Sequence, residues 1–456
     1  MRALLPVLLA GITPLLVLSL LMIGVGLNLV AWQPPILWTS QFGTQGYCSG
    51  NKVTEVLVDS TGFYAAGYNG YRLQPRCSDP SPSYLYIARY DLNGHLVWSQ
   101  QFGSPNNGSI TGLAANTQGL FITMRGNSTD SILVRKYDLN GNQNWTSEFS
   151  GVLGFAPTIS LSQTGIYVAS LGSTVYGNNT SPVTVRLYSF QGSVIWTKVF
   201  GNELDIGQLV SYAASDALYL AGADDAGLFD THAFVSKYDL SGTFEWSRQF
   251  DTASFVCYCT PTVLFADASG AYVGGSVLDA FPGQVPSGLI GGDGFLRKYD
   301  SSGGELYTLQ YGPDHSPDHV SMGIRNISAT SSGTYVTGGG GGQLFLLKCD
   351  TGCQSIWSFR LQDASITALT TSLGDSAIYL AGYRTSGLDQ LSFIEELSFS
   401  SSLVFFGVNP PLSFGLVVLV AGLGIVGFAL FRKLRRGRLR HAYSPAKPAK
   451  QAILRT

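Results

Sequence analysis

One short phrase recurs through most of the chain, and it constrains the fold more than any other feature. Its centre is an aromatic residue that returns about every 50 residues, at Trp38, Trp98, Trp145, Trp196, Trp246, Tyr307 and Trp357. The motif Lys-Tyr-Asp-x-x-Gly precedes it in its fullest copies, VRKYDLNGNQNWTSEFS at 134–150 and VSKYDLSGTFEWSRQFD at 235–251. A fixed period of this size indicates one supersecondary unit built many times.

Each unit also contains a second phrase upstream, such as VLVDSTGFYAAG or VLFADASGAYVGG. In both phrases alternating apolar residues flank short Asp-x-x-Gly or Asn-Gly turns, whose residues accept the backbone conformations of tight hairpins. Two hairpins give four strands, and a four-stranded sheet repeated every 40–50 residues is typical of a β-propeller blade. An unrelated series of β-sandwiches would not keep one phrase at one period. The sequence therefore predicts an all-β propeller.

The first and last units are fragments that complement each other. Residues 36–43 supply a fourth strand without its three predecessors, and residues 363–398 supply three strands without a fourth. We predict that the N-terminal strand completes the last blade, which removes the exposed edges of an open ring. The result is a seven-bladed propeller over 36–398, with units at about 44–103, 104–150, 151–201, 202–251, 252–312, 313–362, and 363–398 plus 36–43.

The core phrase Lys-Tyr-Asp-x-x-Gly-x-x-x-Trp-x-x-x-Phe-Gly resembles the SBBP family of bacterial and archaeal β-propeller repeats. The resemblance extends from Trp38 to Ser398 and implies an extracytoplasmic propeller module without a defined reaction. Three units depart from the phrase: the third reads LYSFQG, the fifth has Tyr307 for tryptophan, and the sixth reads KCDTGC.

The C-terminal region predicts a membrane span. Residues 412–431 hold no charged residue, and at about 1.5 Å per residue a helix of this length crosses a hydrocarbon core of roughly 30 Å. Six cations follow between Arg432 and Arg440, and such clusters stay on the cytoplasmic side. A buried core helix would not end in such a cluster. We expect a transmembrane helix at 410–431, a basic cytoplasmic tail at 432–456, and the repeats on the extracytoplasmic side.

The N-terminal segment 1–31 predicts a second anchor. After Arg2 an apolar stretch runs from Ala3 to about Val30, longer than the roughly 7–15 apolar residues of a secretory signal. No convincing small-x-small cleavage site precedes Trp32. An uncleaved signal anchor at 1–31 is favoured over a cleaved signal peptide, and either would export the repeats.

Charge separates the repeats from the ends and argues against one class of partner. Between Lys52 and Glu396 lie all 29 acidic residues and 17 of the 27 basic ones, an excess of 12 negative charges. Nucleic-acid affinity rests on cations that neutralise phosphates. We therefore predict no nucleic-acid partner.

Closure of the ring also predicts which face is free. Both membrane segments should leave from the face of the tight turns, so the longer connections point away from the bilayer; these are Gly43–Lys52, Tyr68–Ser83, Ala223–Thr231, Asp251–Pro261, Ser276–Asp293 and Gly312–Val320. Long loops on a rigid scaffold usually carry binding. We expect a non-enzymatic binding module for an envelope protein or glycan at the cell surface. The alternative is an extracytoplasmic hydrolase, lyase or quinone-type oxidoreductase that uses the central channel.

Six cysteines in an exported chain predict disulfides. Cys48 and Cys77 fall in neighbouring loops of the distal face and form one candidate bridge. Cys349 and Cys353 flank a three-residue hairpin turn and form the other. A bridge between Cys257 and Cys259 is strained at that spacing, so pairing with each other, remaining free, and pairing with another chain all stay open.

Two groups of side chains suggest a metal, and neither suffices to predict one. The distal-loop sequence PDHSPDH contains Asp314, His315, Asp318 and His319, whose side chains could hold a divalent metal, but no third histidine is near. An acidic residue also recurs around the start of the third strand, at Asp130, Asp230, Asp293 and Asp389. Capping of turns is favoured there over calcium. No cofactor is predicted, with Ca²⁺ as the weaker alternative.

No catalytic constellation is visible. None of the five histidines lies in a Ser/His/Asp or Cys/His pattern, and no glycine loop precedes a helix. Glycosylation sequons fit an exported surface domain; the candidate positions are Asn107, Asn127, Asn178, Asn179 and Asn326.

Overall fold

The structure is a computed structural model of the chain, and it describes much of the region between Ile36 and Ser398. The described ranges are 36–42, 50–59, 62–71, 84–102, 108–126, 131–150, 156–171, 182–200, 206–225, 231–252, 259–285, 292–312, 322–340, 343–361, 364–371, 377–386 and 389–398. They contain 28 β-strands. The propeller is one compact unit, Pro34–Phe399.

Five sheets of four antiparallel strands each hold one uninterrupted unit of the sequence. The first contains β6 (Ser109–Asn116), β7 (Gly119–Arg125), β8 (Ser131–Tyr137) and β9 (Gln143–Ser150). The second contains β10 (Thr158–Ser162), β11 (Gly165–Leu171), β12 (Val183–Tyr188) and β13 (Val194–Phe200). The third contains β14 (Ile206–Ala213), β15 (Ala217–Asp225), β16 (Thr231–Asp239) and β17 (Phe244–Phe250). The fourth contains β18 (Thr260–Asp267), β19 (Gly270–Val277), β20 (Asp293–Asp300) and β21 (Glu305–Tyr311). The fifth contains β22 (Gly323–Thr330), β23 (Gly333–Gly340), β24 (Gln343–Cys349) and β25 (Ser355–Leu361).

The other eight strands form one sheet, so the described residues make six sheets and the prediction of seven separate blades is corrected. One half contains β2 (Gly50–Asp59), β3 (Gly62–Tyr71), β4 (Tyr84–Tyr90) and β5 (Leu96–Phe102). The other half contains β26 (Ala364–Thr371), β27 (Ala377–Ser386), β28 (Asp389–Ser398) and β1 (Ile36–Phe42). The two halves merge because β2 and β28 come close enough for one parallel bridge, between Gly50 and Gln390.

The predicted closure by the N-terminal strand is confirmed. Strand β1 pairs antiparallel with β28, and the register places Trp38 opposite Glu396 and Gln41 opposite Phe393. The hydroxyl of Thr39 also donates to the Glu395 carboxylate at 3.1 Å. The first described strand of the chain is thus held by the last one.

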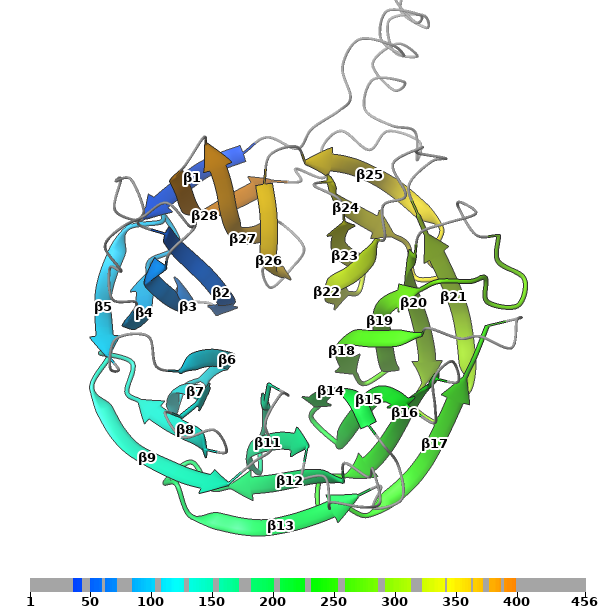
Figure 1. The fold of residues 1–456 in the computed structure, drawn as a ribbon, viewed down its shortest axis with the longest axis horizontal. Coiled ribbons are helices and arrows are strands. Elements are labelled where there is room, and N and C mark those ends of the chain that lie inside the picture. The colour runs from blue at the N-terminus through cyan, green and yellow to red at the C-terminus, as the bar shows by residue number, and fades with distance from the viewer. Residues whose placement is uncertain are drawn as a thin grey trace, which may run out of the picture. The chain divides into compact units, whose positions relative to one another are not determined.

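The sheets stand around a central axis like the blades of a wheel (Figure 1). We call the four strands of a sheet A to D from the axis outward, so that β2, β6, β10, β14, β18, β22 and β26 are the A strands. Each A strand contacts the A strand of both neighbours, which closes the ring. The apolar core lies between adjacent sheets: one cluster joins Tyr64 and Ile87 to Ile122 and Tyr137 of the next sheet.

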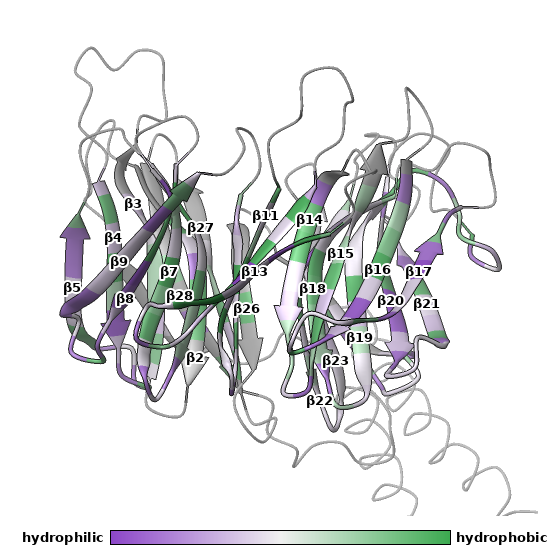
Figure 2. Cartoon of the chain, turned by 90° about the horizontal axis from the view of Figure 1, so that it is seen from below, coloured by the Kyte–Doolittle hydropathy of each residue, from purple (hydrophilic) through white to green (hydrophobic). Residues whose placement is uncertain are grey.

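The two faces of the ring differ in the length of their connections. The A–B and C–D connections are short, as at 60–61 between β2 and β3 and at 91–95 between β4 and β5. On the opposite face, the B–C and D–A connections include 72–83 between β3 and β4, 278–292 between β19 and β20, and 312–322 between β21 and β22. We call these the turn face and the loop face. Strands β5 and β17, on different sides of the ring, both run from the turn face to the loop face (Figure 2).

Both ends of the propeller lie on the turn face. Ile36 begins β1 opposite Leu397, the residue before the last one of β28. Ser398 is opposite Ala377, where strand β27 leaves its A–B connection. The predicted segments 1–31, 410–431 and 432–456 lie outside the described residues. Within the described ranges, no helix is long and apolar enough to pass through a bilayer.

Candidate functional site

The best-defined part of the loop face is the B–C segment Leu278–Val285, which follows β19. Gln310 of β21 fixes this segment through both ends of its amide: Nε2 donates to the Asp279 carbonyl at 3.2 Å, and Oε1 accepts from the Phe281 amide at 3.1 Å. The backbone N–H of Gln310 in turn donates to the side-chain Oε1 of Gln284 at 3.2 Å. The segment is therefore held at its start, middle and end.

Phe281 anchors the same segment in the core. Its side chain is 1% exposed and packs against Phe250 of β17 and Phe295 of β20, with ring centroids 6.2 and 5.2 Å away. The Arg297 guanidinium lies over the rings of Phe281 and Phe250, at 4.5 and 4.7 Å from the two centroids. Such cation–π contacts strengthen when they are desolvated. The loop face thus has a rigid base between the third and fourth four-stranded sheets.

Polar and apolar groups are both exposed above this base. Leu278 and Val285 are exposed, Val285 by 84%. On the neighbouring sheet, Nδ1 of His232 is 2.7 Å from Oδ1 of Asp251, the residue that follows Phe250. We name the surface made by Leu278–Val285, His232 and Asp251 the platform. Apolar contacts beside a polar pair on a rigid support are typical of a binding surface.

The structure shows no metal-binding cluster in its described part, where no three His, Cys, Asp or Glu side chains gather. Asp293, one of the recurring acidic residues, is buried and accepts a hydrogen bond from Gln310 Nε2 at 2.8 Å. This carboxylate therefore supports the platform. Most other predicted site residues lie outside the described ranges, namely Cys48, Cys77, Cys257, Asp130, Asp230, Asp314, His315, Asp318, His319, Asn107, Asn127, Asn178 and Asn179.

Asn326 is the candidate glycosylation site whose position is described. It lies on the A strand β22 and is partly buried, and its Nδ2 donates to Thr337 Oγ1 at 3.1 Å. A glycan would need that nitrogen and free space around it. The placement therefore argues against modification of Asn326.

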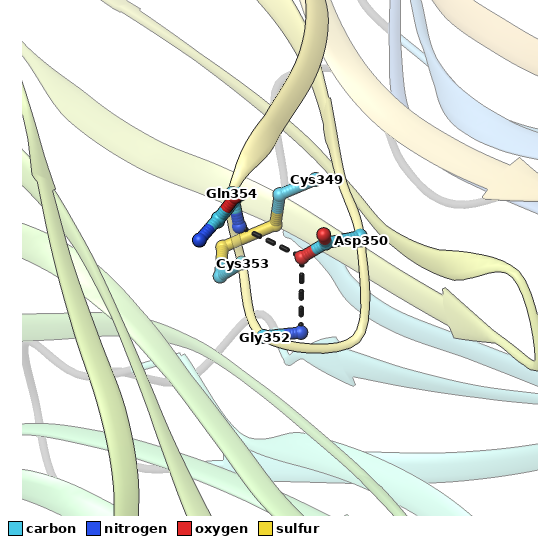
Figure 3. The surroundings of a disulfide bond; sticks show 5 residues. All are labelled: Cys349, Asp350, Gly352, Cys353 and Gln354. Atoms are coloured by element: carbon cyan, nitrogen blue, oxygen red, sulfur yellow. Dashed lines mark hydrogen bonds between the residues drawn. A yellow bond between two sulfur atoms is a disulfide. The ribbon is translucent and has the colours of Figure 1, made fainter. Parts of the chain in front are cut away.

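The predicted Cys349–Cys353 pair is confirmed, with the two Cα atoms 4.5 Å apart (Figure 3). The bond spans the C–D turn between β24 and β25. The Asp350 carboxylate accepts backbone hydrogen bonds from Gly352 at 3.0 Å and Gln354 at 2.8 Å inside the same turn. Cys259 is also disulfide-bonded, so of the alternatives left open for it, the free thiol is ruled out.

The repeated tryptophans join adjacent sheets. The indole N–H of Trp98 donates to the Leu139 carbonyl in the next C–D turn at 3.0 Å, and Trp246 donates to Ser301 in the same way at 3.0 Å. The lysine of the same phrase reaches this carbonyl as well: Lys237 Nζ donates to the Ser301 carbonyl at 3.2 Å. The repeated Lys-Tyr-Asp-x-x-Gly-x-x-x-Trp phrase therefore encodes the contact between sheets.

One carboxyl on an A strand stands out by its surroundings. Glu55 of β2 lies opposite Ala66, which packs in the cluster between the first two units, so both side chains project to that side. Burial raises the pKa of Glu55 to about 8. Among the described residues, no hydrogen bond or ion pair to its side chain is present. The sequence gives no sign of this group, because Glu55 occupies an ordinary strand position and belongs to no recognisable motif.

Comparison with known proteins adds similarity at the level of the fold. No protein-family model matches the sequence, and no curated protein matches it. Similar solved structures include the polysaccharide lyase Uly1, with a TM-score of 0.49 at 12% identity, covering 76% of this chain and 90% of that one. A prolyl endopeptidase has a TM-score of 0.46 at 12% identity over 80% of this chain, which spans about half, 51%, of that enzyme. The Dos1 propeller has a TM-score of 0.44 at 12% identity, covering 78% of this chain and 95% of that one.

Proposed function

We propose that this protein is a non-enzymatic binding module at the cell surface, which recognises an envelope protein or glycan through the loop face of its propeller. The observation that carries the proposal is the difference between the faces. Short hairpin connections form the turn face, and the long connections, such as 278–292, lie on the loop face. A rigid scaffold with long loops on one side is suited to binding.

The platform is where the proposal is tested first. Val285→Asp and Leu278→Asp place charge on exposed apolar positions, so they should leave folding intact and weaken retention of the full chain on its envelope ligand at least fivefold. His95→Asp on the turn face, where the His95 side chain is 79% exposed, is the matched control and should retain full binding. Equal retention by all three variants on every envelope fraction would contradict the proposal.

We further propose that the propeller is held on the outside of a membrane by residues 1–31 and 410–431, with the tail 432–456 in the cytoplasm. Support comes from the apolar sequences of these segments and from the exit of both propeller ends at the turn face. Protease added to intact cells should remove the repeats and spare a C-terminal tag. The mass of the mature N-terminus decides between anchor and cleaved signal.

The repeat phrase also supports the proposal that the units are SBBP-type repeats, with the eight-stranded sheet acting as two blades. Each half of that sheet contains a complete A-to-D series. Loss of the Gly50–Gln390 bridge would then leave the ring intact. Gly50→Pro removes the backbone N–H at this position, and the proposal expects the variant to keep the cooperative unfolding of the parent chain.

The second candidate is an extracytoplasmic enzyme, and Glu55, on the innermost strand β2 with its side chain toward the next sheet, is the observation that favours it. A carboxyl with a pKa of about 8 is protonated near neutrality and could act as a general acid. Turnover of an envelope polysaccharide or peptide that Glu55→Gln abolishes and Val285→Asp preserves would favour the enzyme. If no substrate in such a panel is consumed, the binding module remains the better account.

A further inference from the structure

The outer edge of the turn face carries exposed apolar side chains. They stand in the first two positions of the D strands, and each is between 48% and 58% exposed: Leu96, Val97, Val194, Ile195, Phe244 and Leu306. They recur at the same two positions of four units, which scattered single apolar residues would not do. We call these six residues the rim.

The position of the rim follows from strand direction. Each D strand begins at a C–D turn and runs toward the loop face, as β5 and β17 show (Figure 2). The residues that open these strands therefore lie at one level, on four of the sequence units. The ring of apolar residues is interrupted at β9, which begins with Gln143 and Asn144.

The ends of the propeller are at the same level as the rim. Ile36 is the first residue of β1, which is itself a D strand, and Ser398 ends the C strand beside it. In the sequence, the apolar stretch that ends near Val30 comes shortly before Ile36, and the uncharged stretch 412–431 begins shortly after Ser398. An extended chain covers at most about 3.5 Å per residue. Such short links keep the turn face near any bilayer that contains these segments.

The charges near the rim argue for apolar contact rather than attraction to anionic lipid. The carboxylates of Asp91, Asp138, Asp239 and Asp300 accept backbone hydrogen bonds within their own turns. Lys237, a nearby cation, is held by Glu245 at 2.9 Å and by the Ser301 carbonyl. Arg248 donates to the Gly303 carbonyl at 2.8 Å, and Lys198 lies over the Trp196 ring, so the cations near the described rim are mixed with carboxylates and form no purely basic patch that would recognise lipid phosphate. Apolar side chains are what it presents.

We propose that the rim rests in the interfacial layer of the bilayer that anchors the chain, so that the propeller lies flat on the membrane with its loop face outward. This inference rests on the proposed membrane attachment. It assigns the partner of the turn face as the lipid surface, and it explains why apolar residues are exposed in the outer strands at the end nearest the chain termini.

The test compares two residues of one strand. Ile195 and Val199 both lie on β13 and are 53% and 51% exposed, but Val199 is near the loop-face end. The full chain carrying Ile195→Cys or Val199→Cys is labelled with a polarity-sensitive fluorophore and reconstituted in nanodiscs of zwitterionic lipid that contain a shallow nitroxide quencher. Phe244→Cys and Val285→Cys form a second pair, and far-UV circular dichroism checks that each variant is folded.

We expect quenching at positions 195 and 244 to be at least threefold stronger than at 199 and 285, with no gain when anionic lipid replaces part of the bilayer. Equal quenching within both pairs, in discs that contain the protein, would overturn the rim inference and leave the attachment standing. Protein that never enters the discs would overturn the attachment and the inference together. Strong quenching that appears only with anionic lipid would overturn the apolar contact.

Discussion

The C–D turns of the molecule fall into two kinds, and their comparison explains the repeated phrase. Five turns have glycine at the fourth position, with φ between 79° and 93° at Gly94, Gly141, Gly192, Gly242 and Gly303. The sixth has Cys353, with φ of 55°. All six make the same two backbone hydrogen bonds, as from Asp138 to the Asn142 carbonyl and from Gly141 to that of Asp138. The backbone is common, and only the side chains differ.

The difference lies in what the preceding sheet places against the turn. A Cβ on Gly141 would be 2.9 Å from the Trp98 ring, and one on Gly303 would be 2.8 Å from the Trp246 ring. Where Cys353 supplies such a Cβ, the aromatic residue of the preceding sheet is Tyr307, and it packs in one cluster with Cys349 and Cys353. The two departures from the repeat are therefore linked: a smaller ring accompanies a larger turn residue.

The largest effect is expected from adding a methyl group to a glycine turn. Gly141→Ala should lower the free energy of unfolding by about 3 kcal/mol, since positive φ costs about 1–2 kcal/mol and overpacking adds about 1–3 kcal/mol. Urea denaturation of the full chain measures the change. Gly283→Ala is the matched control, because its φ is 79° and nothing lies within 4 Å of the added Cβ. If Gly141→Ala lowers the free energy of unfolding no more than Gly283→Ala does, contact with the Trp98 indole is not the reason that this turn requires glycine.

The next effect is expected from restoring the common residues at the sixth turn and at the aromatic position that packs against it. Tyr307→Trp should cost about 2 kcal/mol, because the indole would meet the Cβ of Cys353. Cys349→Tyr with Cys353→Gly restores the common phrase but also removes the disulfide, so the comparison is made within that background, where Tyr307→Trp should cost less than half as much. A coupling of more than about 1 kcal/mol between the two sites supports the link. An equal cost of Tyr307→Trp in both backgrounds would show that Tyr307 and Cys353 vary independently.

A third effect measures what the disulfide contributes in place of glycine. Cys349→Ala combined with Cys353→Ala opens the small loop that the bond closes, so the chain-entropy model predicts a loss of about 2 kcal/mol. Reduction should therefore lower the melting temperature of the native chain by more than that of the double variant, which lacks this bond. If reduction lowers both melting temperatures equally, the turn is held by its hydrogen bonds alone.

The smallest effect concerns the turn carboxylates. The Asn142 side chain and backbone amides that donate to Asp138 lower its pKa, so this group stabilises the fold at neutral pH and loses that contribution as the pH falls below the ordinary value of about 3.9. Asp138→Ser copies the third unit, where Ser189 occupies this position. The variant should lose less stability than the parent between pH 5 and pH 2 in thermal melts. An identical acid profile would contradict this role.

Much of the fold was predictable because its determinants are local. Turn residues and alternating apolar residues specify each hairpin within its own short stretch of sequence, and the orphan strand at Trp38 matched the incomplete last unit. The merger of the first and last units was not predictable, since it depends on one bridge between Gly50 and Gln390. No local pattern encodes a contact of that kind.

The platform was predictable in position but not in construction. The sequence placed a long connection at Ser276–Asp293 on the loop face, which agrees with the connection 278–292 between β19 and β20. It contained no sign that Phe281 is buried or that Gln310 binds the segment, because both depend on partners in other strands. Glu55 was missed for a similar reason: its pKa is set by burial between sheets.

Closure by β1 has a consequence for how the chain is made. The Thr39–Glu395 hydrogen bond joins residues separated by 356 positions, so the first strand emerges from the ribosome long before its partner exists. Until β1 and β28 pair, the partly synthesised propeller has two open strand edges, which are templates for pairing with other chains. Interrupted synthesis would release incomplete propellers with these open edges, and the cell must protect or degrade them. Completion of the last strand, β28, is the step that ends this vulnerability.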